Sequence, residues 1–259
     1  MDASLQDCDV ASTTWSAWHH VPWVDAHRVV ARLQARIAKA AKAGEWRKVR
    51  TLQRLLTKSS SAKALAVRRV TENQGRKTPG VDKQTWDTPE AKWKAVVDLG
   101  NKRYKPLPLR RIYIPKANGD KRPLGIPTMR DRAMQALHLL ALEPVAETTG
   151  DHHSYGFRRE RSTADAIEQV RNVLGRKASP KWVLEGDIKG CFDHISHDWL
   201  LENIPMDKVM LKKMAQMRFR FQQGIIPYGR RNSTGWNYLA NSCQYDIGRS
   251  ASNARRKVL

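Results

Sequence analysis

Trp182-Val-Leu-Glu-Gly-Asp-Ile-Lys-Gly-Cys-Phe-Asp193 is the stretch from which the fold can be worked out. Its apolar beginning predicts a β-strand over 182–184 that runs directly into Asp187. Asp193 follows six residues later. A carboxylate at the end of a strand is well placed to hold a divalent cation, although a helix cap or a surface turn explains one such aspartate equally well.

The region before this stretch is predicted to be mainly helical. Apolar residues at helical spacing predict helices over 25–43, 45–58 and 59–73, with Gly44 ending the first and Ser59, Ser60 or Ser61 capping the third. A solvated face is enough to explain one basic helix, but three in succession favour contact with RNA. The basic residues that we expect to bind RNA are Arg28, Arg32, Arg36, Arg47, Lys48, Arg50 and Arg54.

The middle of the chain mixes strands with helices. A loop is predicted over 74–82, and Asn118-Gly119 predicts a hairpin turn between strands at 110–115 and 121–127. Further helices are predicted over 88–99, 131–145 and 164–174. The expected fold class is therefore α+β.

The net charge points to the partner. The chain has 47 Lys and Arg against 25 Asp and Glu, a net charge of +22 that is spread along the sequence. Such a charge attracts a polyanion, and nucleic acid is the commonest one. An anionic membrane surface fits less well, because no long amphipathic helix combines a basic face with bulky aromatic anchors.

Composition also limits the cellular location. No apolar run is long enough for a membrane span, and Asp2, Asp7 and Asp9 stand where a signal peptide would be basic, so we expect a cytoplasmic protein without a membrane partner. Three cysteines without a Cys-x-x-Cys pair support neither a disulfide framework nor a zinc ribbon.

Four ordered motifs give the chain a specific resemblance. Gly186 to Ile195 resembles the first catalytic motif of group II intron reverse transcriptases, whose palm has an α+β fold. It is preceded in the family's order by Gly80-Val-Asp-Lys-Gln-Thr-Trp86, the stretch from Tyr113 to Thr128, and Ser154-Tyr-Gly-Phe-Arg-Arg-Glu-Arg-Ser-Thr-Ala-Asp-Ala166. The opening helices are similar to the family's N-terminal extension.

The resemblance implies roles for the matched residues. Asp187 would bind Mg²⁺ with the backbone carbonyl of Ile188, and Phe192 would exclude a ribose 2′-hydroxyl. Lys116 and Arg122 would neutralise the incoming triphosphate. The partners implied are group II intron RNA, a template RNA with a DNA primer, and dNTP. The pocket for template and nucleotide would be formed by Tyr155, Gly156, Phe157 and Arg158.

The family pattern breaks towards the end of the chain. The family's second acidic motif contains Asp-Asp, and this pair is absent from the 259 residues. The family also has a stretch Gly-Thr-Pro-Gln-Gly-Gly, which this sequence lacks. With permitted codons, the tail read one base later spells Pro-Thr-Glu-Glu-Gly-Thr-Pro-Gln-Gly-Gly-Ile-Ile-Ser, which contains that stretch. We therefore hypothesise an extra base near the Lys212-Lys213 codons, and a disordered tail after Lys213.

The predicted organisation has three parts. Residues 1–73 form a basic helical extension, 74–213 form fingers and an incomplete palm, and 214–259 form a tail unrelated to the family.

The expected function is that of a group II intron reverse transcriptase and maturase, in a truncated form without catalytic competence. The alternatives are a non-catalytic RNA-binding remnant or pseudogene product, and a basic RNA binder of the ribosomal type. The incomplete palm should leave Leu137, Leu140 and Trp182 short of packing partners.

Overall fold

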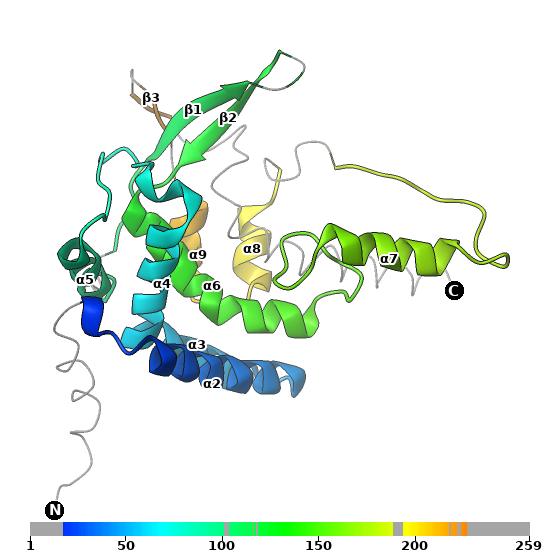
Figure 1. Cartoon of the computed structure of the whole chain (residues 1–259), viewed down its shortest axis with the longest axis horizontal. Coiled ribbons are helices and arrows are strands. Elements are labelled where there is room, and N and C mark those ends of the chain that lie inside the picture. The colour runs from blue at the N-terminus through cyan, green and yellow to red at the C-terminus, as the bar shows by residue number, and fades with distance from the viewer. Residues whose placement is uncertain are drawn as a thin grey trace, which may run out of the picture.

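A computed structural model describes residues 18–100, 104–115, 117, 119–188, 194–217, 219–221 and 224–226. Helices dominate and a small sheet accompanies them, so the predicted α+β class is confirmed (Figure 1). The elements are η1 (Trp18–His20), α2 (Trp23–Lys42), α3 (Trp46–Lys58), α4 (Ser60–Glu72), η2 (Gln74–Lys77), α5 (Pro89–Asp98), β1 (Leu109–Pro115), β2 (Lys121–Ile126), α6 (Met129–Thr149), α7 (Thr163–Leu174), α8 (His197–Asn203), α9 (Lys208–Ala215), β3 (Phe219–Phe221) and β4 (Gly224–Ile226).

The first three long helices begin and end close to where the sequence places them. Gly44 follows α2 with φ +70°, a left-handed conformation that glycine adopts without steric cost. Ser59 proves to be the cap of α4, because its hydroxyl accepts a hydrogen bond from the Ala62 amide at 3.2 Å. Local sequence signals were therefore sufficient to predict this helical region.

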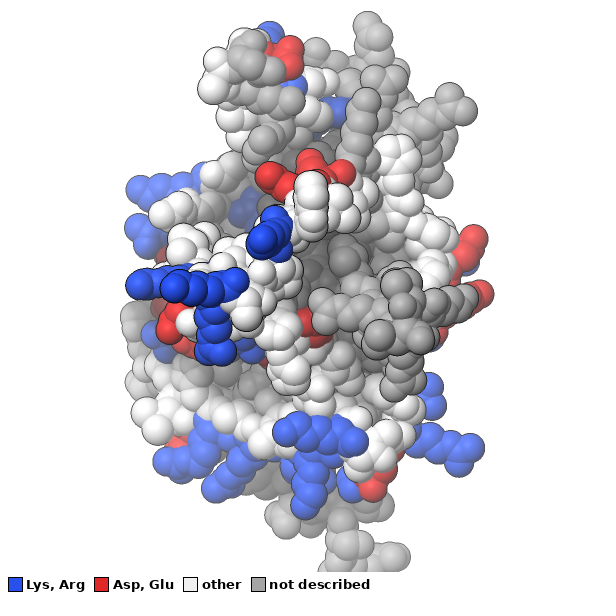
Figure 2. All heavy atoms as spheres, turned by 90° about the vertical axis from the view of Figure 1, so that its right-hand side faces the viewer, with Lys and Arg blue, Asp and Glu red and all other residues white. Residues whose placement is uncertain are grey.

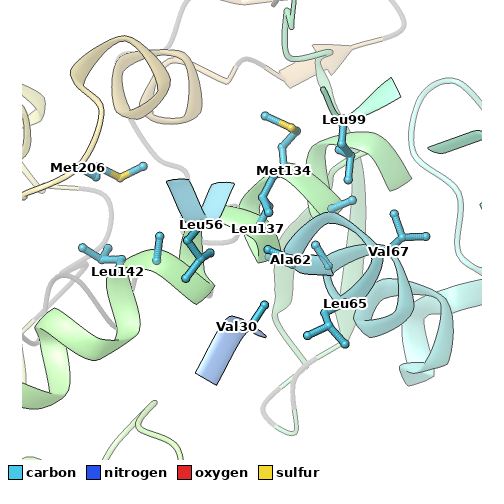
Figure 3. Close-up of a cluster of buried hydrophobic side chains, with 14 of the residues drawn as sticks. Val30, Leu56, Ala62, Leu65, Val67, Leu99, Met134, Leu137, Leu142 and Met206 are labelled. Carbon is cyan, nitrogen blue, oxygen red and sulfur yellow. The ribbon is translucent and has the colours of Figure 1, made fainter. Parts of the chain in front are cut away.

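The hydrophobic core surrounds α6. Helices α2 and α4 lie along it, α3 contacts it too, and their apolar stripes meet there. Figure 3 shows Val30, Leu56 and Leu65 from these three helices in the cluster that includes Leu137 of α6. Because Leu137 is only 1% exposed, the expectation that it would lack packing is wrong. Leu140 is partly buried against the same cluster.

Pro144 interrupts the hydrogen bonding of α6 but not the helix itself. A proline has no N–H, so the carbonyl of Leu140, four residues earlier, loses its ordinary partner. The side-chain amide of Gln34 in α2 donates to that carbonyl at 2.9 Å. Gln53 of α3 donates to the next carbonyl, that of Ala141, at 3.2 Å. Two glutamines from the N-terminal helices thus bind the backbone of α6 around its proline.

Strands β1 and β2 form the predicted hairpin, which projects away from the helices (Figure 1). They pair antiparallel from Arg110 opposite Ile126 to Pro115 opposite Lys121. Part of the tail that we expected to be disordered is ordered, since β3 pairs parallel with the start of β1 and β4 pairs with β3. The sheet order is β2-β1-β3-β4. Beyond residue 226 the tail lies outside the described residues.

The strand predicted over 182–184 is not formed. The chain from 182 to 188 belongs to no helix or strand, and Trp182 and Leu184 are 94% and 98% exposed. The exposure of Trp182 confirms the expectation that it lacks packing. A strand needs a neighbour to accept its backbone hydrogen bonds, and within the described residues none lies beside this segment. Local apolar character alone therefore gave the wrong element.

Candidate functional site

The basic side chains of α2 and α3 form an exposed surface. All seven predicted RNA-binding residues are exposed, and the apolar stripes of the same helices are turned to the core. Arg28 pairs with Asp25 at 2.9 Å and Lys48 with Glu45 at 2.7 Å. Figure 2 shows Lys and Arg gathered along the lower edge of the molecule, the level at which α2 and α3 lie in Figure 1. This surface, the α2–α3 basic face, has the charge and accessibility that phosphate contacts require.

The hairpin carries the residues predicted to contact the triphosphate. Arg122 lies in β2 opposite Ile114, whereas Lys116 lies outside the described residues. Gly119 in the turn has φ +83°, as a tight hairpin connection requires. On β1, the Arg111 guanidinium lies 5.6 Å from the centre of the Tyr113 ring, which is 53% exposed.

A buried carboxylate fixes the base of the hairpin. Asp131, 1% exposed, accepts hydrogen bonds from the Tyr104 hydroxyl at 2.7 Å, the Thr128 hydroxyl at 2.7 Å and the Leu107 amide at 3.3 Å. Burial raises the pKa of Asp131, and these hydrogen bonds oppose that shift. The Lys213 ammonium adds a bond to the Tyr104 carbonyl at 2.7 Å. The approach to β1 is thereby held against the start of α6.

Arg132 connects the loop after α4 to the same helix. Its guanidinium donates to the carbonyls of Gly75 at 2.9 Å and Pro127 at 3.0 Å, and also to that of Thr78. Gly80 then passes so close to Thr128 that an added Cβ would lie 2.6 Å from its Cα. The motif that begins at Gly80 is thus docked beside the hairpin.

The predicted pocket residues lie on the loop after α6. Tyr155 is partly buried, and the Arg161 guanidinium lies 5.9 Å from the centre of its ring. Phe157 is 55% exposed and has φ +61°, which is unusual for a residue with a side chain. Arg158 differs from both, since its side chain is 7% exposed and forms an ion pair with Glu147 at 2.6 Å.

Asp187 and Ile188 lie in the exposed segment that follows Trp182, while Phe192 and Asp193 lie outside the described residues. Among the described residues, no group of three or more His, Cys, Asp or Glu side chains could hold a metal ion. One exposed carboxylate does not enclose a divalent cation. The described part of the chain therefore does not by itself fit the two-metal site that the resemblance implies.

Sequence reasoning missed the residues that hold these segments in place. The sequence pattern gives Asp131 only as the first residue of the helix predicted over 131–145, and it gives no role to Arg132 or Glu147. Each is a charged residue within or next to an otherwise apolar helix, and that position was an available signal. Their partners Tyr104, Gly75 and Arg158 are 11 to 57 residues away in sequence, so periodicity could not identify these contacts.

The described helices include none that is both long enough and apolar enough to cross a membrane.

Comparison with known proteins gives two adjacent family matches. Residues 18–99 match the N-terminal domain of reverse transcriptase, and residues 114–252 match reverse transcriptase (RNA-dependent DNA polymerase). The second match extends past Lys213 into the tail that we hypothesised to be out of frame.

Several curated relatives agree with these matches. Protein YkfC of Escherichia coli is 35% identical over 198 residues, covering 74% of this chain and 50% of that protein. Group II intron-encoded protein LtrA of Lactococcus lactis subsp. cremoris is 37% identical over 160 residues, covering 61% of this chain and 26% of LtrA. The putative COX1/OXI3 intron 1 protein of Saccharomyces cerevisiae is 34% identical over 142 residues, covering 54% of this chain and 17% of that protein.

The chain thus spans half or less of the length of these relatives. Its two matches follow one another in the order N-terminal domain and then polymerase, and they include the α2–α3 basic face, strand β2 of the hairpin and the 155–158 loop. With these matches the chain belongs to the reverse transcriptase family, and it is similar to proteins encoded by introns, among them a group II intron-encoded protein.

Proposed function

We propose that this chain is the RNA-binding and nucleotide-pocket portion of an RNA-directed DNA polymerase that also acts as an intron maturase. The two successive family matches over 18–99 and 114–252 carry the proposal. In it, the α2–α3 basic face binds group II intron RNA, and the hairpin with the 155–158 loop receives the RNA template, the DNA primer and dNTP. Mg²⁺ is the metal, and the bacterial cytoplasm is the site of action.

The proposal assigns catalysis to a complete site that this chain alone does not supply. Asp187 would be one of its metal-binding carboxylates, but two-metal phosphoryl transfer needs at least one further acidic side chain. The family's Asp-Asp pair is absent from the sequence. The chain by itself is therefore expected to bind RNA without copying it, which is the behaviour of the RNA-binding remnant that we considered as an alternative.

The RNA-binding part can be tested with charge-neutralising variants. Replacing Arg32, Arg36, Arg50 and Arg54 with Gln should weaken binding of a structured intron RNA, because each lost phosphate contact reduces counterion release. The dependence of log Kd on log salt should become shallower by about 0.7–0.9 per lost contact. The control variant replaces four other basic residues with Gln. These residues are exposed and lie outside this face: Arg171, Arg176, Lys177 and Lys181. Equal weakening by both sets would contradict a defined RNA-binding face.

Primer extension tests the catalytic part. The full chain, an RNA template with an annealed DNA primer, dNTP and Mg²⁺ should give no extension. Mg²⁺-dependent extension that Asp187→Ala abolishes would show instead that the chain completes the site with other carboxylates.

Sequencing the coding DNA is an independent test of the reading frame. If the codons after Lys213 cannot spell the family stretch when they are read one base later, the frameshift hypothesis is wrong.

A further inference from the structure

Arg158 joins α6 to the loop over residues 151–161. Its Nε and Nη2 donate to the two carboxylate oxygens of Glu147, at 2.9 and 2.6 Å. Its Nη1 donates to the carbonyls of Asp151 at 2.5 Å and Ser154 at 3.1 Å. One guanidinium thus binds a helix carboxylate on one side and two loop carbonyls on the other.

This arrangement depends on the planar shape of the arginine side chain. A guanidinium offers donors in a fixed fork that matches both oxygens of a carboxylate, whereas a lysine ammonium is a single point of charge. The hydrogen bond from Arg158 lowers the pKa of Glu147, and the same bond raises the pKa of Arg158. The ion pair is therefore charged at neutral pH, when both of its hydrogen bonds are strongest.

A second carboxylate supports the same loop one helical turn earlier on α6. Glu143 lies four residues before Glu147, so both side chains occupy one face of the helix. An oxygen of Glu143 lies 3.6 Å from the Arg159 guanidinium. The Glu143 side chain is 10% exposed, so its charge is little screened by water. Two adjacent arginines of the loop thus face two carboxylates of α6.

The residues beside Arg158 have a conformation that must be held in place. Phe157 has φ +61° and Glu160 has φ +53°, and each left-handed residue with a side chain costs about 1–2 kcal/mol. Such conformations persist when surrounding contacts determine them. Arg158 supplies four hydrogen bonds next to Phe157, whose ring lies at the surface, 55% exposed. A loop released from α6 would relax towards negative φ and turn that ring elsewhere.

We propose that Glu147 is a positioning residue for the pocket: through Arg158 it sets the 151–161 loop so that Tyr155 and Phe157 face the paired template and primer. The inference rests on the proposed function, which places Tyr155 and Phe157 in that pocket. Glu147 acts on the loop and does not contact the nucleic acid. Arg158 has the same positioning role, because its guanidinium is occupied by protein oxygens.

Photocrosslinking of the full chain tests this role. The probe is an RNA template that carries 4-thiouridine next to the end of an annealed DNA primer. After irradiation, crosslinked peptides are mapped, and the yield within residues 151–161 is divided by the yield within α2 and α3. This ratio compares two places on the same bound molecule, so it is insensitive to the fraction of protein that is folded.

Three variants complete the experiment. Glu147→Gln keeps the size of the side chain but removes its charge, and Arg158→Lys keeps the charge but removes the fork. Each should lower the ratio about tenfold, the factor expected when a charge-assisted hydrogen bond no longer holds the loop. The control is Glu72→Gln, which removes the charge from another arginine–carboxylate pair, in which Nε of Arg68 donates to both oxygens of Glu72 at 3.0 Å. That variant should leave the ratio unchanged.

The outcomes separate this inference from the proposed function. Absence of crosslinks anywhere in the wild-type chain would overturn the proposed function and the inference with it. Crosslinks in α2 and α3 but none in the loop would leave RNA binding intact and overturn the inference. A ratio that stays constant while Glu147→Gln lowers the melting temperature would reduce the pair to a stabilising contact, which also overturns it.

Discussion

His138 is a single residue of α6 whose protonation should affect folding. Burial lowers its pKa from 6.5 to about 4, and Asp207 at the start of α9 opposes that shift. Between these two pH values the imidazole is neutral in the folded chain and protonated in the unfolded chain. The unfolded state then binds the additional proton, so the stability contributed by neutral His138 is lost as the pH falls from 6.5 to about 4.

His138→Gln should therefore reduce the acid sensitivity of the fold. Between pH 7 and pH 4.5 the wild-type chain should lose on the order of 2–3 kcal/mol more unfolding free energy than the variant. Urea unfolding at several pH values measures the difference. Asp131, whose pKa burial raises, contributes with the opposite sign, but it is present in both proteins and cancels in the comparison. Parallel curves for the two proteins would show that His138 does not titrate as described.

At the scale of elements, α6 tolerates a proline because side chains of neighbouring helices donate hydrogen bonds to the carbonyls around it. Gln34 donates to the Leu140 carbonyl, which Pro144 leaves without an amide partner. The two helices are therefore joined by a polar contact of fixed geometry in addition to apolar packing. Such a contact specifies which residues meet, whereas apolar packing alone tolerates small shifts along the axis.

A double-mutant cycle tests this compensation. Gln34→Leu should lower the unfolding free energy by about 1–3 kcal/mol, because a partly buried carbonyl loses its donor. In a Pro144→Ala background the helix regains a backbone amide, so the same substitution should cost about 1 kcal/mol less. Chemical unfolding of the four proteins gives the coupling energy. A coupling of zero would mean that Gln34 does not replace the missing amide.

At the scale of the whole molecule, α7 and the segment after it stand apart from the core. None of the α7 residues is buried, and a stripe on the helix presents Ile167, Val170 and Val173 at 68%, 56% and 50% exposure. Trp182 and Leu184 add further apolar surface nearby along the chain. Exposed apolar surface of this extent favours association. We therefore expect the chain to aggregate when no partner covers this surface.

Val170→Lys should reduce self-association of the chain without a large change in stability. The substitution places a charge in the apolar stripe of a helix that carries no buried residue. Sedimentation over a range of protein concentrations measures the effect. The control is Val209→Lys, which adds the same charge at a 65% exposed valine of α9, outside the stripe. Equal effects of both variants would mean that added charge, and not the α7 stripe, controls association.

Local signals predicted most of the fold and none of the contacts that organise the site. The helices over 23–72, the hairpin and α7 follow from apolar spacing, capping serines and Asn118-Gly119, which are signals within a few residues of each element. The prediction of a strand at 182–184 was wrong, because a strand forms only where a distant segment pairs with it. The ordered β3 was missed for the same reason, since it forms by pairing with β1.

In the candidate site, too, the sequence predicted local features but not the contacts between distant segments. The exposure of the α2–α3 basic face could be read from the helical pattern, and the resemblance located the 155–158 loop. The roles of Asp131, Arg132 and Glu147 could not be found in this way, because each depends on contacts between segments that are distant in sequence. The assigned roles of Lys116 and Phe192 stay predictions.

Helix α6 also sets the distance between the base of the hairpin and the 151–161 loop. Asp131 and Arg132 at one end hold the base of the hairpin and the loop after α4, and Glu147 near the other end holds the 151–161 loop. With a rise of about 1.5 Å per residue, the sixteen residues from Asp131 to Glu147 set a spacing of about 24 Å. Inserting one residue between them would lengthen that spacing only slightly but turn one end by about 100° relative to the other. Changes in the length of α6 should therefore be far less tolerated than changes in the length of the loops that it spaces.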